Sequence, residues 1–276
     1  MGALDLMAGP ARRLVALTIA GSDSGGGAGI AADLKCFEAH GVWGTCAVVA
    51  VTAQNTLGVQ DQASLPPALV RAQIASVAGD IGVDAAKTGM LASAELVEAV
   101  AAAVEEAAID RLVVDPVLVG KHGHALLPDD AVTALVTHLL PLATVVTPNL
   151  SEASRLVGFE VASRPAMEDA ARTLVDRGAA VVMVKGGHLG AGDSPDCILA
   201  AGGQPVWLEA PRIDARHTHG TGCVLSAAIC AELARGMDPV DACVAAKQFC
   251  LRAIAGGVGL GAGVGPVNPG WQREVY

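Results

Sequence analysis

Short apolar runs alternate along the chain with longer segments in which apolar residues recur at helical spacing. The apolar runs predict strands at 14–20, 45–53, 83–88, 111–115, 143–147 and 179–185, followed by a hairpin at 196–201 and 205–209. The helical segments are 30–40, 66–79, 93–107, 165–177, 221–235 and 239–255, and another begins at Pro128. Strands that alternate with helices indicate a parallel sheet, and strands that are apolar throughout indicate that both sheet faces are covered. The sequence therefore predicts one α/β domain with a central, mostly parallel sheet and helices on both faces.

Polar and glycine-containing segments follow most of these strands. In an open sheet of this kind, ligands bind beyond the carboxyl ends of the strands. The turns that should share this rim come after Ala20, Ala53, Lys87, Asp115, Thr147 and Lys185. We therefore expect the functional site along this rim.

Composition and charge narrow the class of protein. Apolar residues make up 52% of the 276 residues and aromatic residues only 3%, so small aliphatic side chains must fill the core. The formal charge of −10 leaves no basic stripe for a nucleic-acid backbone. No apolar run reaches the ~18–20 residues of a membrane-spanning helix. The seven cysteines show no CxxC pair, which is typical of reduced thiols. These features predict a cytoplasmic protein that binds neither nucleic acid nor membrane.

The segment HTHGTGC at 217–223 stands directly before a predicted helix. Gly220 and Gly222 allow the backbone to turn with its N–H groups exposed, and the start of a helix carries partial positive charge. Such a nest suits the charge that develops on a phosphoryl group during transfer. Cys223 in the first turn should have a lowered thiol pKa, so that it could accept a hydroxyl proton. The alternative is a glycine-containing turn beside a small buried cysteine.

Asn149 and Glu152 follow the strand that ends at Thr147. Side chains three residues apart on one helical turn can hold a hydrated Mg²⁺, which favours oxygen ligands. Asp115 also ends a strand and could assist this metal site. The alternative is that Asn149 caps a helix.

Two other charged residues have both a functional and an ordinary interpretation. Lys185 ends a strand beside two glycines, where it could reach a nucleotide phosphate or extend its ammonium group into water. Asp33 lies in the helix after the glycine-rich turn at 21–29, where it could belong to a solvated face. That turn completes neither a dinucleotide fingerprint nor a P-loop, but it permits the close approach of a flat ligand.

Seven motifs in one order give the chain a family resemblance. They are LTIAGSDSGGGAGIAADLK at 17–35, AQNT at 53–56, KTGML at 87–91, DPVLVGKHGHALL at 115–127, TPNLSEA at 147–153, KGGHL at 185–189 and HTHGTGC at 217–223. Together they resemble the hydroxymethylpyrimidine and phosphomethylpyrimidine kinases of thiamine biosynthesis, within the ribokinase-like superfamily. The resemblance covers about residues 14–266 and implies a single kinase domain there, with an extension at 1–13 and a tail at 267–276. It also implies the use of ATP and Mg²⁺ and a homodimeric state.

The resemblance implies a role for each matching position. Gly220, Gly222 and Cys223 would form an anion hole, with Cys223 as the base that activates the hydroxymethyl oxygen. Gln54, Asp33, Gly21, Met90 and Val117 would surround the pyrimidine, with Gln54 bonded to its edge and Met90 and Val117 on its two faces. Lys185, Thr218, Asn149 and Gly222 would lie at the ATP phosphates. Glu152, Asp115 and Asn149 would organise Mg²⁺.

Three other functions compete with this interpretation. A pyridoxal or pyridoxine kinase of the same fold is the closest, but kinases of that kind commonly lack the glutamine of the Ala-Gln-Asn-Thr stretch, so Gln54 favours the pyrimidine. A hydrolase with Cys223 as nucleophile would need a histidine and an orienting Asn or Asp nearby. A non-catalytic binding protein would hold the pyrimidine without turning over ATP.

Overall fold

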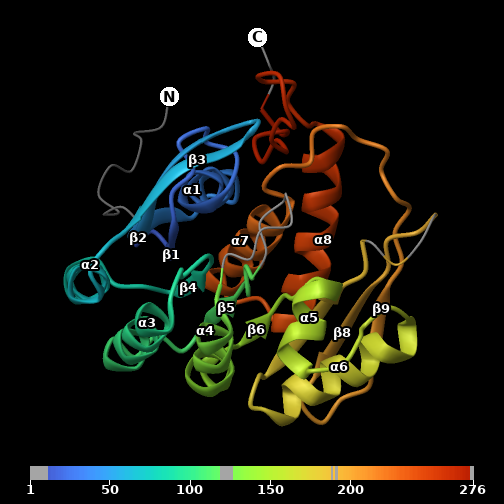
Figure 1. The fold of residues 1–276 in the computed structure, drawn as a ribbon, viewed down its shortest axis with the longest axis horizontal. Coiled ribbons are helices and arrows are strands. Elements are labelled where there is room, and N and C mark those ends of the chain that lie inside the picture. Colours follow the sequence, from blue (N-terminus) through green and yellow to red (C-terminus); the bar gives the residue numbers. More distant parts are fainter. Residues whose placement is uncertain (1–11, 119–126, 188, 190–191, 274–276) are drawn as a thin grey trace, which may run out of the picture.

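A single mixed sheet forms the centre of the molecule. The computed structural model describes residues 12–118, 127–187, 189 and 192–273. Its nine strands follow the order β3-β2-β1-β4-β5-β6-β7-β8-β9 (Figure 1). They are β1 (Val15–Gly21), β2 (Trp43–Asn55), β3 (Gly58–Ser64), β4 (Ala85–Thr88), β5 (Leu112–Val114), β6 (Val145–Val146), β7 (Val181–Lys185), β8 (Asp196–Ala200) and β9 (Val206–Leu208). All neighbours from β2 to β7 are parallel, whereas β2–β3, β7–β8 and β8–β9 are antiparallel. The predicted, mostly parallel sheet is confirmed.

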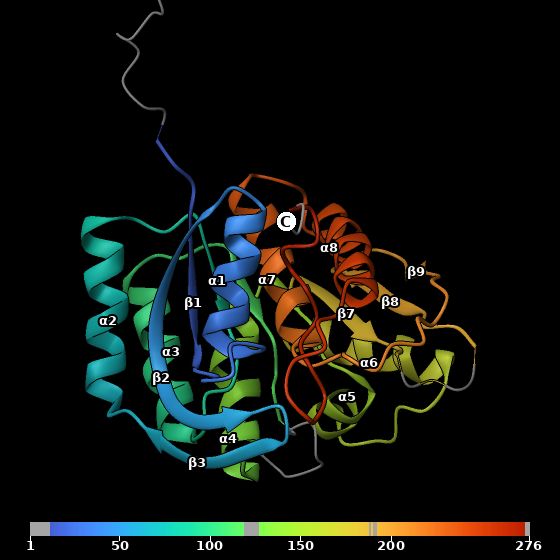
Figure 2. The same cartoon turned by 90° about the horizontal axis from the view of Figure 1, so that it is seen from above.

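Helices cover both faces of this sheet, as predicted (Figure 2). One face carries α1 (Gly29–Ala39), α7 (Thr221–Ala234) and α8 (Pro239–Ala255). The other carries α2 (Pro67–Asp80), α3 (Ala94–Glu106), α4 (Asp129–Ala134), α5 (Leu150–Val157) and α6 (Arg164–Asp176). After α4 the chain makes a π turn at Leu135–Leu139 and a short 3-10 turn at Leu140–Leu142.

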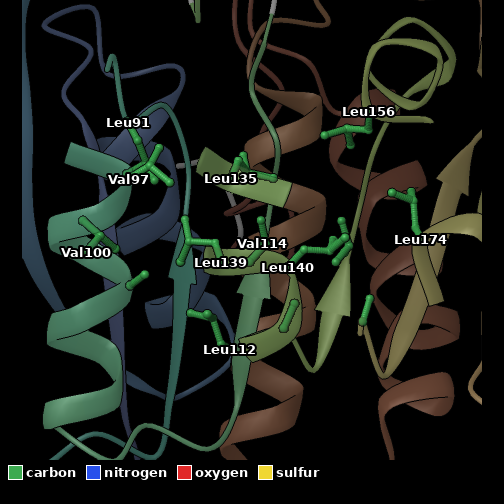
Figure 3. Close-up of a cluster of buried hydrophobic side chains, with 14 of the residues drawn as sticks. Leu91, Val97, Val100, Leu112, Val114, Leu135, Leu139, Leu140, Leu156 and Leu174 are labelled. Atoms are coloured by element: carbon green, nitrogen blue, oxygen red, sulfur yellow. The ribbon is translucent and has the colours of Figure 1, made fainter. Parts of the chain in front are cut away.

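The core consists of two apolar clusters separated by the sheet. Successive strand residues point to opposite faces, so Leu112 and Val114 of β5 belong to the cluster under α2–α6, while Val113 belongs to the one under α1, α7 and α8. Figure 3 shows the first cluster, in which leucines and valines of α3, β5 and the segment after α4 interlock. In the second cluster α7 is buried continuously from Val224 to Ala234. This burial fixes the position of the first turn of α7, which the functional site uses.

The structure differs from the sequence-based expectation in three places. Strand β3 was not expected, and neither was the full length of α5. The chain after Gly256 carries no predicted helix or strand, but it is anchored, since Val267 is buried and its N–H donates to the carbonyl of His219. Most of the predicted extension at 1–13 and the centre of the 115–127 motif lie outside the described residues. In the part of the chain that the structure describes, no helix is long and apolar enough to span a membrane.

Candidate active site

A large pocket of about 1430 Å³ opens at the carboxyl ends of the parallel strands. Twelve of the predicted site residues line it, namely Gly21, Gln54, Met90, Asp115, Val117, Asn149, Glu152, Lys185, Thr218, Gly220, Gly222 and Cys223. Asp33 is the predicted site residue that does not. The expectation that these segments share one rim is therefore confirmed, while the role of each residue stays a prediction.

Two glycine-containing turns meet at the centre of the pocket. Gly220 precedes α7 with a φ of 80°, and a Cβ at this position would collide with the carbonyl oxygen of Gly27. Gly29, at the start of α1, has a φ of 53° and would collide in the same way with the carbonyl of Gly21. Both positions thus require glycine, because other residues rarely adopt this conformation and have no room for a side chain. The close approach brings the first turns of α1 and α7 together at the pocket.

Cys223 is the third residue of α7 and borders the pocket. The N–H of Gly29 donates to its sulfur at 3.4 Å. Burial raises the pKa of the Cys223 thiol to about 11; Lys87 opposes this shift, and Asp33 and Asp115 add to it. The predicted lowering of this pKa is therefore wrong. The partial charge at the helix start does not compensate for the loss of water around the sulfur.

Lys185, Asp115 and Glu152 form a charged cluster beside the start of α7. The ammonium nitrogen of Lys185 lies 3.3 Å from Asp115 Oδ1 and 4.0 Å from Glu152 Oε2. Burial opposes the ionisation of Asp115, but Lys185, Lys87 and the hydroxyl of Ser226 lower the pKa of its carboxyl. Burial raises the pKa of Glu152 to about 7, with Lys185 opposing the shift and Asp115 adding to it. The cluster thus holds one firmly ionised carboxylate and one that exchanges its proton near neutral pH.

Asn149 takes part in a capping box at the start of α5. Its side-chain oxygen accepts the Glu152 N–H at 2.9 Å, and Glu152 Oε2 accepts the Asn149 N–H at 2.8 Å. The helix-cap interpretation is therefore confirmed. Among the described residues no group of three or more His, Cys, Asp or Glu side chains is arranged to hold a metal ion. Mg²⁺ commonly uses one or two carboxylates and several waters, so Asp115 and Glu152 fit it as an oxygen-only donor pair.

A second group of lining residues, Gln54, Met90 and Val117, carries no charge of its own. The side-chain oxygen of Gln54 accepts from the Thr52 hydroxyl at 3.3 Å, which orients its amide. A Cβ at Gly21 would lie 2.6 Å from Met90 Cε, so glycine leaves room for the methionine side chain. A side-chain amide and two apolar side chains that line one pocket suit a flat heterocycle with a polar edge.

The structure places Asp33 behind this pocket, where its side chain is inaccessible to solvent. Both carboxylate oxygens lie 3.0 Å from Lys87 Nζ, and one accepts from the Thr18 hydroxyl at 2.6 Å. The expected position of Asp33 beside the pyrimidine is therefore corrected, and so is its alternative placement on a solvated face. Lys87 is also inaccessible and was not expected among the site residues, although it ends an apolar strand and begins the KTGML motif at 87–91.

Asp23 and His219 were also missed by the sequence analysis. They connect the two turns through a 2.9 Å contact between His219 Nε2 and Asp23 Oδ2, and both residues line the pocket. Asp23 also accepts the N–H groups of Gly27 and Ala28. Burial opposes its ionisation, but the hydrogen bonds, that of His219 foremost, lower the pKa of Asp23. The Nε2 atoms of His219 and Gln54 are 3.4 Å apart, so this pair adjoins the heterocycle end of the pocket.

Comparisons with known proteins agree with this geometry. The family model for phosphomethylpyrimidine kinase matches residues 23–268. The hydroxymethylpyrimidine/phosphomethylpyrimidine kinase of Streptomyces coelicolor is 52% identical over 256 residues, which cover 92% of this chain and 94% of that protein. The corresponding kinase of Bacillus subtilis is 44% identical over 253 residues, covering 92% and 93%.

Solved structures lead to the same group of enzymes. An ADP complex of Bacillus subtilis pyridoxal kinase superposes with a TM-score of 0.88 at 40% identity, covering 95% of this chain and 99% of that one. Phosphomethylpyrimidine kinase from Clostridium difficile superposes with a TM-score of 0.78 at 36% identity, covering 88% and 100%. The ribokinase-like fold implied by the sequence motifs is confirmed, and the chain belongs to the phosphomethylpyrimidine kinase family.

Proposed function

We propose that this protein transfers the γ-phosphoryl group of ATP to the hydroxymethyl group of 4-amino-5-hydroxymethyl-2-methylpyrimidine, and then phosphorylates the monophosphate to the pyrophosphate, in thiamine biosynthesis. The observation that carries this proposal is that three groups of residues line one pocket. The start of α7, with Gly220, Gly222 and Cys223, borders the same pocket as the Lys185 cluster and the Gln54, Met90 and Val117 group. An acceptor hydroxyl and a donor phosphate can therefore meet at the first turn of α7.

The charged end of the pocket suits the nucleotide. Lys185 would contact the phosphates of ATP, together with Thr218 and the backbone of Gly222 and Asn149. Asp115 and Glu152 would hold Mg²⁺, whose contribution there is positive charge next to the phosphate oxygens. Because phosphoryl transfer passes through a loose transition state, positioning and charge neutralisation supply most of the catalysis.

Cys223 would receive the proton of the acceptor hydroxyl. A thiol accepts a proton only in its thiolate form, and with a pKa of about 11 that form is a small fraction at neutral pH. If proton transfer to sulfur limits the reaction, turnover should therefore rise tenfold per pH unit from pH 7 to 9. Turnover that does not change with pH would instead indicate that positioning of the substrates, and not proton transfer to sulfur, determines the rate.

The test is a substrate panel with purified protein. Release of ADP is measured with hydroxymethylpyrimidine, with its monophosphate, with pyridoxal and without an acceptor. We expect both pyrimidines to have a higher kcat/KM than pyridoxal, with no release in the absence of an acceptor. A preference for pyridoxal would refute the proposed substrate, and acceptor-independent release would refute the kinase assignment.

Pyridoxal phosphorylation is the second candidate, because the 0.88 superposition is to a pyridoxal kinase. A hydrolase built on Cys223 is less compatible with the geometry. A cysteine nucleophile needs a histidine beside its sulfur. His219, four residues before Cys223, instead directs its Nε2 toward Asp23 and Gln54.

The family resemblance also supports a cytoplasmic homodimer as part of the proposal. Light scattering coupled to size-exclusion chromatography tests this assembly directly. A mass of about twice the 27.6 kDa of one chain is expected, and a monomer across the working concentration range would contradict it.

A further inference from the structure

We propose that Lys87 and Asp33 form a buried charge pair that sets the protonation of Cys223, which makes Lys87 a positioning residue for the reaction. This inference rests on the proposed function, because it assumes that Cys223 receives the acceptor proton. Neither residue of the pair lines the pocket, so both would act through the sulfur and not through a substrate contact.

Contacts on one face of α1 connect the pair to the sulfur. The N–H of Gly29 donates to Cys223 Sγ at 3.4 Å. Asp33 follows Gly29 by four residues and therefore lies on the same face of the helix, where it bonds Lys87 Nζ through both oxygens at 3.0 Å. One turn further, Cys36 Sγ donates to the carbonyl of Val224 at 3.5 Å, so this face of α1 packs along the first turn of α7.

Lys87 lies directly behind the pocket wall. A Cβ added to Gly89, which lines the pocket, would be 3.3 Å from Lys87 Nζ. The ammonium group is thus next to the cavity and yet inaccessible to solvent. Stability alone does not explain the pair, since replacing a buried ion pair with well-packed apolar residues is often neutral or stabilising. A fixed positive charge near a sulfur that must ionise is a direct functional reason for this arrangement.

Four charged groups on four elements act on the thiol. They are Asp33 on α1, Lys87 on β4, Asp115 after β5 and Lys185 at the end of β7. Burial is the largest influence and raises the thiol pKa, Lys87 is the next largest and lowers it, and Asp33 and Asp115 raise it. The Lys87 ammonium is therefore the main group that opposes the effect of burial. Removing Lys87 or Asp33 should move the thiol pKa in opposite directions.

The experiment measures the alkylation rate of Cys223 by iodoacetamide from pH 6.5 to 10 in the ligand-free protein. Mass spectrometry of the peptide that contains Cys223 separates it from five of the other cysteines, and fragmentation of that peptide separates it from Cys230, which lies in the same tryptic peptide. We expect Lys87→Met to slow alkylation at pH 8 by about tenfold or more, because a nearby opposite charge changes a pKa by about one to three units. Asp33→Asn, which keeps the ammonium, should speed alkylation, and the pH profile of kcat should move in the same direction in each variant.

A neutral double variant guards against misfolding. Lys87→Met alone leaves the Asp33 carboxylate buried and unpaired, which can unfold the protein. Asp33→Asn/Lys87→Met removes both charges, and because the influence of Lys87 exceeds that of Asp33 its alkylation should be slower than in wild type. The inference would be overturned if the alkylation rate of Cys223 changed equally and in the same direction in Asp33→Asn and in the double variant. It would also be overturned if Cys223 in the double variant were as reactive as in wild type. Alkylation needs no pyrimidine, so this outcome is independent of the substrate panel.

Discussion

Replacing Glu152 with glutamine should make the protein more stable at alkaline pH and less active. The Glu152 side chain is 5% exposed and lies near the Asp115 carboxylate and the Lys185 ammonium. Glutamine can keep the capping contact with the Asn149 N–H, because its side-chain oxygen also accepts. The substitution therefore removes a titrating proton while it leaves the start of α5 intact.

The magnitude follows from the raised pKa of this carboxyl group. Burial moves it from 4.5 to about 7, which corresponds to about 3 kcal/mol. Since the folded-state pKa is the higher one, the folded protein keeps this proton at pH values where the unfolded chain has lost it. The stabilisation is complete below about pH 4.5 and is lost as the pH rises through about 7. At pH 8 the Gln variant should thus be more stable than wild type by up to about 3 kcal/mol, and at pH 5 by less than about 1 kcal/mol.

The assay is urea unfolding at several pH values between 5 and 8, with EDTA present. Glu98→Gln serves as the matched control, because Glu98 is an exposed glutamate on α3, and it should show no such trend. Adding Mg²⁺ at pH 8 should stabilise wild type more than Glu152→Gln, by the usual linkage between ligand binding and folding. A stability difference that stays constant from pH 5 to 8 would refute the reasoning.

Four further substitutions test the parts of the pocket. Gly222→Ala places a methyl group in ordinary contact, 3.5 Å from Lys185 Nζ, so the fold should persist, but the methyl enters the expected phosphate space and kcat should fall about a hundredfold. Gly220→Ala, whose φ is 80°, should instead cost at least about 1–2 kcal/mol of stability in urea unfolding. Cys223→Ala should lower kcat sharply with unchanged pyrimidine affinity by calorimetry, and unchanged kcat would remove the sulfur as base. Gln54→Met should raise KM for the pyrimidine more than for ATP, and an equal rise would contradict its role at the ring.

The strands whose two faces are covered by helices could be predicted from the sequence because their apolar runs are continuous. Because the carboxyl ends of parallel strands lie at one edge of the sheet, the turns that follow these strands could then be placed together. Strand β3 escaped because its residues 58–64 are mostly exposed and carry no apolar pattern, so only its pairing with β2 reveals it. Similarly, the sequence predicted only one helical turn where α5 lies, because Asn149 and Glu152 fitted a metal site and a helix cap equally well. The capping box shows that one pair of side chains can serve a helix start while the carboxylate of the pair, that of Glu152, still lines the pocket.

The chemical state of the site was harder to predict than its location. Asp33 looked like part of a solvated helix face, since the lysine that neutralises it is 54 residues away in sequence. The thiol of Cys223 was expected to ionise readily because its place at a helix start is visible in the sequence. Burial is not visible there, and it is the larger influence on that thiol.

The charges of the Lys87 pair and the Lys185 cluster do not cancel, and this imbalance explains the state of Glu152. Asp33 is paired with Lys87, and Asp115 with Lys185, which leaves Glu152 as a third carboxylate with only a 4.0 Å contact to a shared ammonium. A buried negative charge without its own partner is costly, so the site takes up a proton, and the pKa of Glu152 rises to about 7. A divalent cation would satisfy the same surplus, which means that it must compete with that proton. Binding of Mg²⁺ should therefore weaken as the pH falls below 7, whereas the two internal ion pairs stay formed.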